Sequence, residues 1–310
     1  LALNPLLSNY KTEVVNNMIC DYQYVLKAPV ETSNDAAEKF CMTTLYESND
    51  EEISAYGIEN GSEYLSKVNV PKKKNEVVAS QGYLEKYSLK VGDRVILKDK
   101  YGENKYTFKI VGSYYYPASL CVFMTNDNFN DVFDKDDGYF TGYFSNEKLK
   151  DIDDKYIATT ITQKDLTTVT DQLDDSMGMS FTLLVGFSVL IYIILMYLLS
   201  KLVIEKNEQN ISMLKILGYS NREASMLYNR ATTVVTIGAI LVSVPFIYYV
   251  FAGLYHYFMF EMKGWLPYVV PWYVFVEMAV IGIICYAIIY FILQKKINKI
   301  KLSQALKSDD

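Results

Sequence analysis

The sequence predicts a membrane protein in which an α+β extracytoplasmic domain, residues 1–175, precedes three transmembrane α-helices in residues 176–310. Charge is the first observation: residues 1–177 hold 19 Lys+Arg and 29 Asp+Glu, whereas residues 178–310 hold 11 and 7. The second is that three long runs with almost no charge lie in the later part. The mean hydropathy of +0.05 therefore averages an acidic soluble part and a membrane part with basic edges.

The chain begins at Leu1 without an initiator Met, and the short apolar stretch that follows lacks the charged region of a signal peptide. We therefore expect this chain to be the C-terminal part of a longer protein.

Strand and helix patterns alternate along the acidic part, which predicts a mixed α+β domain with its own core. The clearest signal is a hairpin, since residues 94–98 and 106–111 alternate in polarity around a turn that contains Gly102. The other strands are expected at 21–27, 52–58, 76–79, 121–124, 139–144 and 156–160, and helices at 35–46, 62–67, 82–89 and 162–173.

The acidic part offers no recognisable catalytic constellation. A nucleophile–His pair, a glycine-rich phosphate loop and a supported acidic pair are all missing, and the chain has a single His. The acidic cluster Asp131, Asp134, Asp136 and Asp137 lacks the spacing of an EF-hand, so a solvated loop is the better interpretation. We expect neither an enzyme nor a bound metal or cofactor, and the net charge has the wrong sign for nucleic-acid binding.

The cysteines match neither a zinc site nor a disulfide framework. A bridge between Cys20 and Cys41 remains open, but free and mostly buried thiols are favoured for these two and for Cys121.

Three apolar runs, at 176–200, 231–255 and 264–294, are long enough to cross a bilayer core that needs about 20 residues. They predict spans at about 177–203, 229–255 and 271–294. Since these runs are apolar on all faces, spans are favoured over the buried helices of a large soluble protein.

The basic residues of the short connections predict the orientation of the spans. Five lie between the first two spans, one lies between the second and third, and five follow the third. These are Lys201, Lys206, Lys215, Arg222 and Arg230; Lys263; and Lys295, Lys296, Lys299, Lys301 and Lys307. The stretch 205–230 and the C-terminal tail are therefore expected in the cytoplasm, and residues 1–175 outside it.

Two residues inside the predicted spans are candidates for function. Pro245 should kink the second span, either as a hinge or as a static bend. Glu277 lies near the outer end of the third span, where a carboxylate is costly. Snorkelling or a pair with Lys263 is favoured over a role in ion translocation.

The stretch 205–230 has the pattern of a helix, a sharp turn and a new helix. Ile211, Leu214 and Leu217 form an apolar stripe with Met213 and Ile216 beside it, and Gly218 supplies a helix stop. Ser220 and Glu223 fit a capping box at the start of the next helix. The alternative is an amphipathic helix at the membrane surface that only anchors the loop.

This stretch resembles the cytoplasmic segment of FtsX-like permeases, the MacB and lipoprotein-release type of ABC transporter. The family pattern Leu-x-x-Leu-Gly-Tyr/Ala-Ser falls on Leu214, Leu217, Gly218, Tyr219 and Ser220. Residues 76–111, with Val91-Gly92-Asp93, are similar to the extracytoplasmic domains of these permeases. Three spans after an outer domain also match the order of elements in the family.

The resemblance implies a permease subunit without an ATPase of its own, which works with a separate cytoplasmic ABC ATP-binding subunit that binds ATP. The residues that would contact this subunit are Ile211, Met213, Leu214, Leu217, Gly218 and Tyr219. It further implies mechanotransmission to the outer domain, for export or removal of a peptide or lipoprotein or for control of cell-wall hydrolases. Membrane lipid and a second permease half or protomer are the other expected partners. A membrane-anchored binding or sensor protein with no ATPase partner is the alternative.

Overall fold

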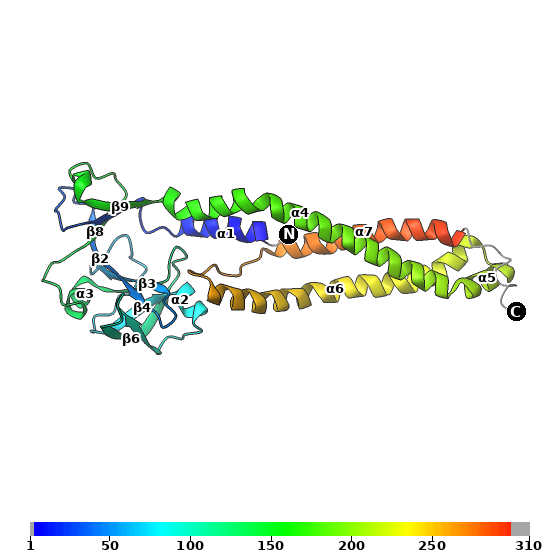
Figure 1. The fold of residues 1–310 in the computed structure, drawn as a ribbon, viewed down its shortest axis with the longest axis horizontal. Coiled ribbons are helices and arrows are strands. Elements are labelled where there is room, and N and C mark those ends of the chain that lie inside the picture. The colour runs from blue at the N-terminus through cyan, green and yellow to red at the C-terminus, as the bar shows by residue number, and fades with distance from the viewer. Residues whose placement is uncertain (1–2, 299–310) are drawn as a thin grey trace. The chain divides into compact units, whose positions relative to one another are not determined.

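The computed structural model describes residues 3–298, and Figure 1 shows their helices and strands. The chain separates into two units, which we describe one at a time. One unit contains Leu6–Asp174 and Gly253–Val269, and the other contains Leu1–Pro5, Asp175–Ala252 and Val270–Asp310. The segment Gly253–Val269 thus belongs with the α+β domain, although residues 253–255 and 264–269 were expected within the second and third apolar runs.

The α+β unit is built on one sheet of nine strands. Its strands are β1 (Tyr22–Leu26), β2 (Glu38–Tyr46), β3 (Glu52–Ile58), β4 (Glu76–Ser80), β5 (Arg94–Lys98), β6 (Lys105–Tyr114), β7 (Cys121–Thr125), β8 (Gly142–Ser145) and β9 (Ile157–Thr162). Its short helices are α2 (Gln81–Lys86), α3 (Asn126–Val132) and the 3₁₀ turn η1 (Asp154–Tyr156), while α1 (Leu3–Asn16) precedes β1.

The strands lie in the order β3-β7-β4-β6-β5-β2-β8-β1-β9, and β3 also pairs with β2. The pairs β3–β7 and β4–β6 are parallel, and the remaining pairs are antiparallel. Two buried apolar clusters form the core. One surrounds Tyr83 and Phe108, and the other contains the stacked rings of Phe40 and Phe144, whose centroids are 4.3 Å apart. Burial of these clusters is the main stabilising contribution to the unit.

The hairpin prediction is confirmed, because β5 and β6 pair from Arg94↔Lys109 to Lys98↔Lys105 around Gly102, which has φ +73°. The prediction of a helix at 35–46 was wrong, because β2 occupies most of this range. Ala36, Phe40 and Leu45 suggested a helical spacing, but the segment pairs along its length with β3. Such pairing overrides a weak local pattern.

Other local differences are smaller. Residues 62–67 form turns instead of the expected helix, and the strands expected at 139–144 and 156–160 begin later, as β8 and β9. Neither α1 nor α3 was predicted. In α1 the apolar residues Leu6, Leu7 and Val14 are buried, and α3 starts with Thr125 accepting a hydrogen bond from the Asn128 amide at 3.2 Å.

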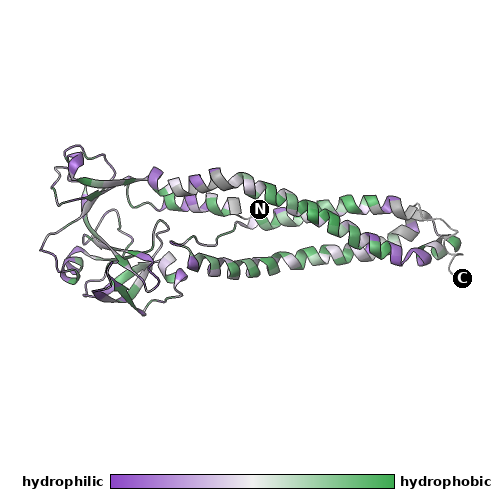
Figure 2. Ribbon diagram, in the orientation of Figure 1, coloured by the Kyte–Doolittle hydropathy of each residue, from purple (hydrophilic) through white to green (hydrophobic). Residues whose placement is uncertain are grey.

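The long helices are α4 (Gln163–Lys206), α6 (Asn221–Glu261) and α7 (Trp272–Asn298). Each contains a stretch apolar and long enough to cross a membrane, at Gly178–Lys206, Thr232–Glu261 and Trp272–Ile292. Figure 2 shows these stretches coloured as hydrophobic over most of their length. Their side chains are largely exposed in the folded chain, which indicates that lipid covers them. The polar helix expected at 162–173 is the first part of α4, and 264–271, expected within the third apolar run, is not helical.

The cysteines are free and buried, so Cys20 and Cys41 do not form a bridge. Burial raises the pKa of the Cys20, Cys41 and Cys121 thiols to about 12. Among the described residues, no group of three or more His, Cys, Asp or Glu side chains is arranged to hold a metal ion, and this includes the aspartates at 131–137.

Candidate functional site in the elbow between α4 and α6

A short helix and a tight turn join the first two membrane helices, and we call residues 205–223 the elbow. The α4 helix ends at Lys206, and α5 (Glu208–Ile216) begins after one residue. Asn207 links the two: its amide donates to the Ile204 carbonyl at 3.1 Å, and its carbonyl accepts from the Ile211 amide at 3.0 Å. Its side-chain amide also donates to the Val203 carbonyl at 2.7 Å. These bonds fix the direction of α5 relative to the end of α4.

Gly218 ends α5 in the way that the sequence predicts. Its φ of +90° lies in the left-handed region, which favours glycine. The Tyr219 amide donates to the Leu214 carbonyl at 3.2 Å, which is the long bond of a Schellman motif. A side chain at position 218 would strain this turn, and so the glycine determines where the chain reverses.

A capping box starts α6, as predicted. The Ser220 amide and hydroxyl donate to the Glu223 carboxylate at 2.9 and 2.7 Å, and the Glu223 amide donates to the Ser220 hydroxyl oxygen at 3.3 Å. The bonds from Ser220 lower the pKa of the Glu223 carboxyl, because they stabilise its charged form. The turn therefore has defined geometry on both sides of Tyr219.

One side of α5 packs against the membrane helices of its own unit. Ile211 is fully buried and forms a cluster with Ile204 from α4 and Ile289 from α7. The family resemblance implies a partner-binding role for Ile211, whereas the structure gives it an anchoring role. The spacing of seven residues between Ile204 and Ile211 could have indicated it, since that spacing returns to the same helix face.

The other apolar side chains of the elbow face outward. Leu217 is 70% exposed and Met213 59%, with Ile216 at 52% and Tyr219 at 48%. Leu214 is half-buried. The structure therefore brings three predicted site residues, Met213, Leu217 and Tyr219, onto an exposed apolar surface together with Ile216, and it places Ile211 inside. An apolar surface held on such a short, fixed helix is typical of a site that another protein covers.

The two intramembrane candidates lie away from the elbow. Pro245 is inside α6, which remains one helix through it, although proline cannot donate to the carbonyl four residues earlier. Glu277 is exposed near the start of α7. Their functional roles stay predictions.

A comparison with protein families matches residues 182–302 to the C-terminal domain of FtsX-like permeases. The match begins in α4 and includes the elbow, α6 and α7. The chain therefore contains an FtsX-like permease domain. FtsX-like permeases are components of ABC transporters, and the elbow connects the first two membrane helices of this domain. A comparison with curated proteins gave no significant match.

Proposed function

We propose that this FtsX-like permease couples ATP hydrolysis by a separate cytoplasmic ATPase to movement of its α+β domain outside the membrane. The observation that carries the proposal is the exposed apolar surface of Met213, Ile216, Leu217 and Tyr219 on the fixed elbow. The chain itself binds no ATP in this scheme. Its partners are the ATP-binding subunit, membrane lipid, and a second permease half or protomer.

The charge pattern supports the orientation. Five basic residues lie between the first two membrane helices and only Lys263 lies between the second and third. The positive-inside rule then puts the elbow in the cytoplasm, on the side where ATP is available. The α+β domain, joined to α4 through β9, lies on the opposite side.

The elbow has the properties needed to receive a force. Its exposed apolar side chains can enter a groove of the ATPase, and each fully buried leucine contributes about 1.5–3 kcal/mol of transfer free energy. Ile211 and the capping box hold the helix and turn in place, so a push at the surface moves α4 and α6 instead of only bending a loop. A helix that only anchors the loop at the membrane surface would need neither the buried Ile211 nor the capping box. The movement would serve export or removal of a peptide or lipoprotein, or control of a cell-wall hydrolase.

Copurification and ATP turnover test the proposal. The full-length protein is purified from its own membrane in mild detergent, as wild type and as Leu217→Asp and Gly218→Pro variants. We expect an ATP-binding subunit in stoichiometric amount with the wild type. Leu217→Asp should weaken its binding by tenfold or more, about 1.4 kcal/mol, because a carboxylate would enter an apolar groove. Gly218→Pro should keep membrane insertion but uncouple ATP turnover, since proline fixes φ near −65°.

Leu217→Met is the matched control, because it keeps an apolar side chain of similar volume at the same exposed position. It should bind the ATPase as the wild type does. Equal binding and equal turnover in Leu217→Asp, Gly218→Pro and Leu217→Met would exclude the elbow as the coupling site. The absence of any ATP-binding subunit from the wild-type preparation would instead favour a membrane-anchored binding or sensor protein.

A further inference from the structure

An ion pair between Glu51 and Lys86 is buried in the α+β unit. The Lys86 Nζ atom lies 2.9 Å from Glu51 Oε2, and the exposed fractions of the two side chains are 0% and 7%. Removing both charges from water is costly unless their remaining hydrogen-bonding positions are filled. The other groups that bond to this pair therefore determine whether it is stable in the core.

Those partners come from the segment after α6. Lys86 Nζ also donates to the carbonyl oxygens of Met262 and Gly264, at 2.6 and 2.9 Å. The second carboxylate oxygen of Glu51 accepts from the Gly264 amide at 2.6 Å. All three ammonium protons and both carboxylate oxygens thus have partners. We call Glu51, Lys86 and residues 262–264 the clasp.

Gly264 gives this segment the shape that the clasp requires. Its φ of +78° is left-handed, which lets its amide and carbonyl reach both charged groups. The clasp uses only main-chain atoms of residues 262–264, so it depends on the backbone conformation of this segment and not on its side chains.

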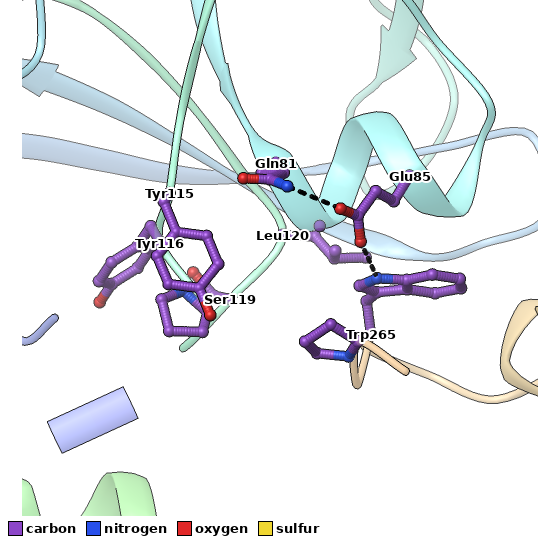
Figure 3. A pocket seen from close by; sticks show the side chains of 10 residues that line it. Gln81, Glu85, Tyr115, Tyr116, Ser119, Leu120 and Trp265 are labelled. Atoms are coloured by element: carbon purple, nitrogen blue, oxygen red, sulfur yellow. Dashed lines mark hydrogen bonds between the residues drawn. The ribbon is translucent and has the colours of Figure 1, made fainter. Parts of the chain in front are cut away.

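Trp265, the residue after the clasp, adds a second attachment, and Figure 3 shows its hydrogen bond to Glu85. Its indole N–H donates to Glu85 Oε2 at 3.0 Å, while Gln81 donates to the other oxygen of Glu85 at 2.8 Å. The ring lies against Gly82, where an added Cβ atom would be 3.1 Å from Trp265 Cδ1. Trp265 thus packs on α2, the same helix that ends with Lys86.

We propose that Glu51 and Lys86 are positioning residues that fasten the end of α6 to the α+β domain, giving the permease a second path for force. The α6 helix runs unbroken from the capping box of the elbow to Glu261, directly before the clasp. Its 41 residues span about 60 Å at 1.5 Å per residue. The first path runs through α4 and β9. The mechanical part of this inference rests on the proposed function, whereas the attachment itself does not.

A purely local stabilising role is the competing explanation, so the variants must release the segment without unfolding the domain. Removing one charge would leave the other buried and unpaired. We therefore choose the double variant Glu51→Leu with Lys86→Met, which replaces the pair by apolar side chains but leaves the Gly264 amide and the two carbonyls without partners. Lys11→Met is the control, because it removes the lysine of a half-exposed ion pair with Asp171 in the same unit.

The first measurement is hydrogen exchange of a peptide covering residues 262–266 in the full-length protein, together with Trp265 fluorescence in a Trp272→Phe background. The double variant should exchange at least tenfold faster there and show a red-shifted, more solvated Trp265, with unchanged exchange in β4 and β6. The control should match the wild type. Unchanged exchange at 262–266 in the double variant would overturn the attachment, whether or not an ATPase binds.

The second measurement separates force transmission from local stability. It restores the attachment between residue 265 and α2 with a disulfide in place of the ion pair. A disulfide between Gly82→Cys and Trp265→Cys fits, because a Cβ built on Gly82 lies 3.6 Å from the Trp265 Cβ, within the usual range of about 3.5–4.5 Å. An oxidant closes the bridge, with the two thiols losing two electrons and two protons to it, and dithiothreitol reopens it. The native cysteines are buried, and Trp265→Cys alone is the control.

In the complex with the ATPase, the double variant should retain binding but lose most of the permease-dependent change in ATP turnover. The double variant that also carries the two cysteines should regain that change when the disulfide is formed and should lose it again when the disulfide is reduced. Turnover that is the same in the wild type and the double variant would overturn the second force path. If no ATPase binds the wild type, the proposed function and this force path fail together, while the exchange result still decides the attachment.

Discussion

Ser220 and Glu223 bond to each other in both directions at the start of α6, with the Ser220 hydroxyl 2.7 Å from the Glu223 carboxylate. The box follows directly after the left-handed Gly218 and the outward-facing Tyr219. In this elbow, therefore, the exposed apolar surface and the first turn of a membrane helix are separated by only a few fixed residues.

Replacing Ser220 by Ala should loosen the first turn of α6. The substitution removes the side-chain acceptor for the Glu223 amide and one donor to its carboxylate, which costs about 1 kcal/mol of local helix stability. Hydrogen exchange of the peptide containing residues 220–226 should rise about fivefold. Ser220→Asp should keep the wild-type rate of amide exchange at position 223, because aspartate is also a good N-cap. Equal rates for alanine and wild type would show that the box does not hold the turn.

The same box predicts a pH dependence. The pKa of Glu223 is lowered in the folded protein by the bonds from Ser220. The stability that ionised Glu223 gives to the first turn of α6 is therefore fully present at neutral pH, above the ordinary carboxyl pKa of 4.5. It is lost as the pH falls through the lower pKa of the folded protein. Exchange at 220–226, corrected for the intrinsic rate, should rise below about pH 4. Glu223→Gln should remove most of this dependence; a variant with the wild-type pH profile would assign it to another carboxylate.

The thiols of Cys20, Cys41 and Cys121 should resist alkylation. Burial raises their pKa to about 12, so almost no thiolate exists at pH 7. Cys41 and Cys121 are fully buried, and Cys20 is only 8% exposed. A maleimide should label none of the three within an hour in the native protein and all three in denaturant. Mass spectrometry of the labelled peptides gives the measurement. Rapid native labelling of any one would contradict its placement in the core.

Local signals in the sequence were enough for some elements and not for others. The β5–β6 hairpin and the Ser220 capping box depend on neighbours within a few residues, and both were predicted. The range of β2 was misassigned because its structure depends on pairing with β3 and β8. The clasp was not anticipated at all. Glu51 and Gly264 are 213 residues apart, and nothing around Lys86 indicates that its ammonium group binds backbone carbonyls from a later segment.

Substitutions on the two sides of α5 should have different effects, one on stability and the other on binding to the ATPase. Ile211 is fully buried against Ile204 and Ile289, so Ile211→Ala should leave a cavity and cost about 2–5 kcal/mol of stability. Leu217 is 70% exposed, so Leu217→Ala should leave the melting temperature of the isolated permease unchanged and weaken its binding to the ATPase. Thermal unfolding in detergent and the binding assay give the two measurements.

The reverse outcome would be informative, because a stable Ile211→Ala with lost binding would place Ile211 on the partner surface. In that case the side-chain bond from Asn207 to the Val203 carbonyl would be the anchor of the elbow, and Asn207→Ala, which removes this bond, should lower the melting temperature in place of Ile211→Ala. With Ile211 as the anchor, Asn207→Ala should lower it by less than Ile211→Ala does, since a partly exposed hydrogen bond contributes about 1 kcal/mol.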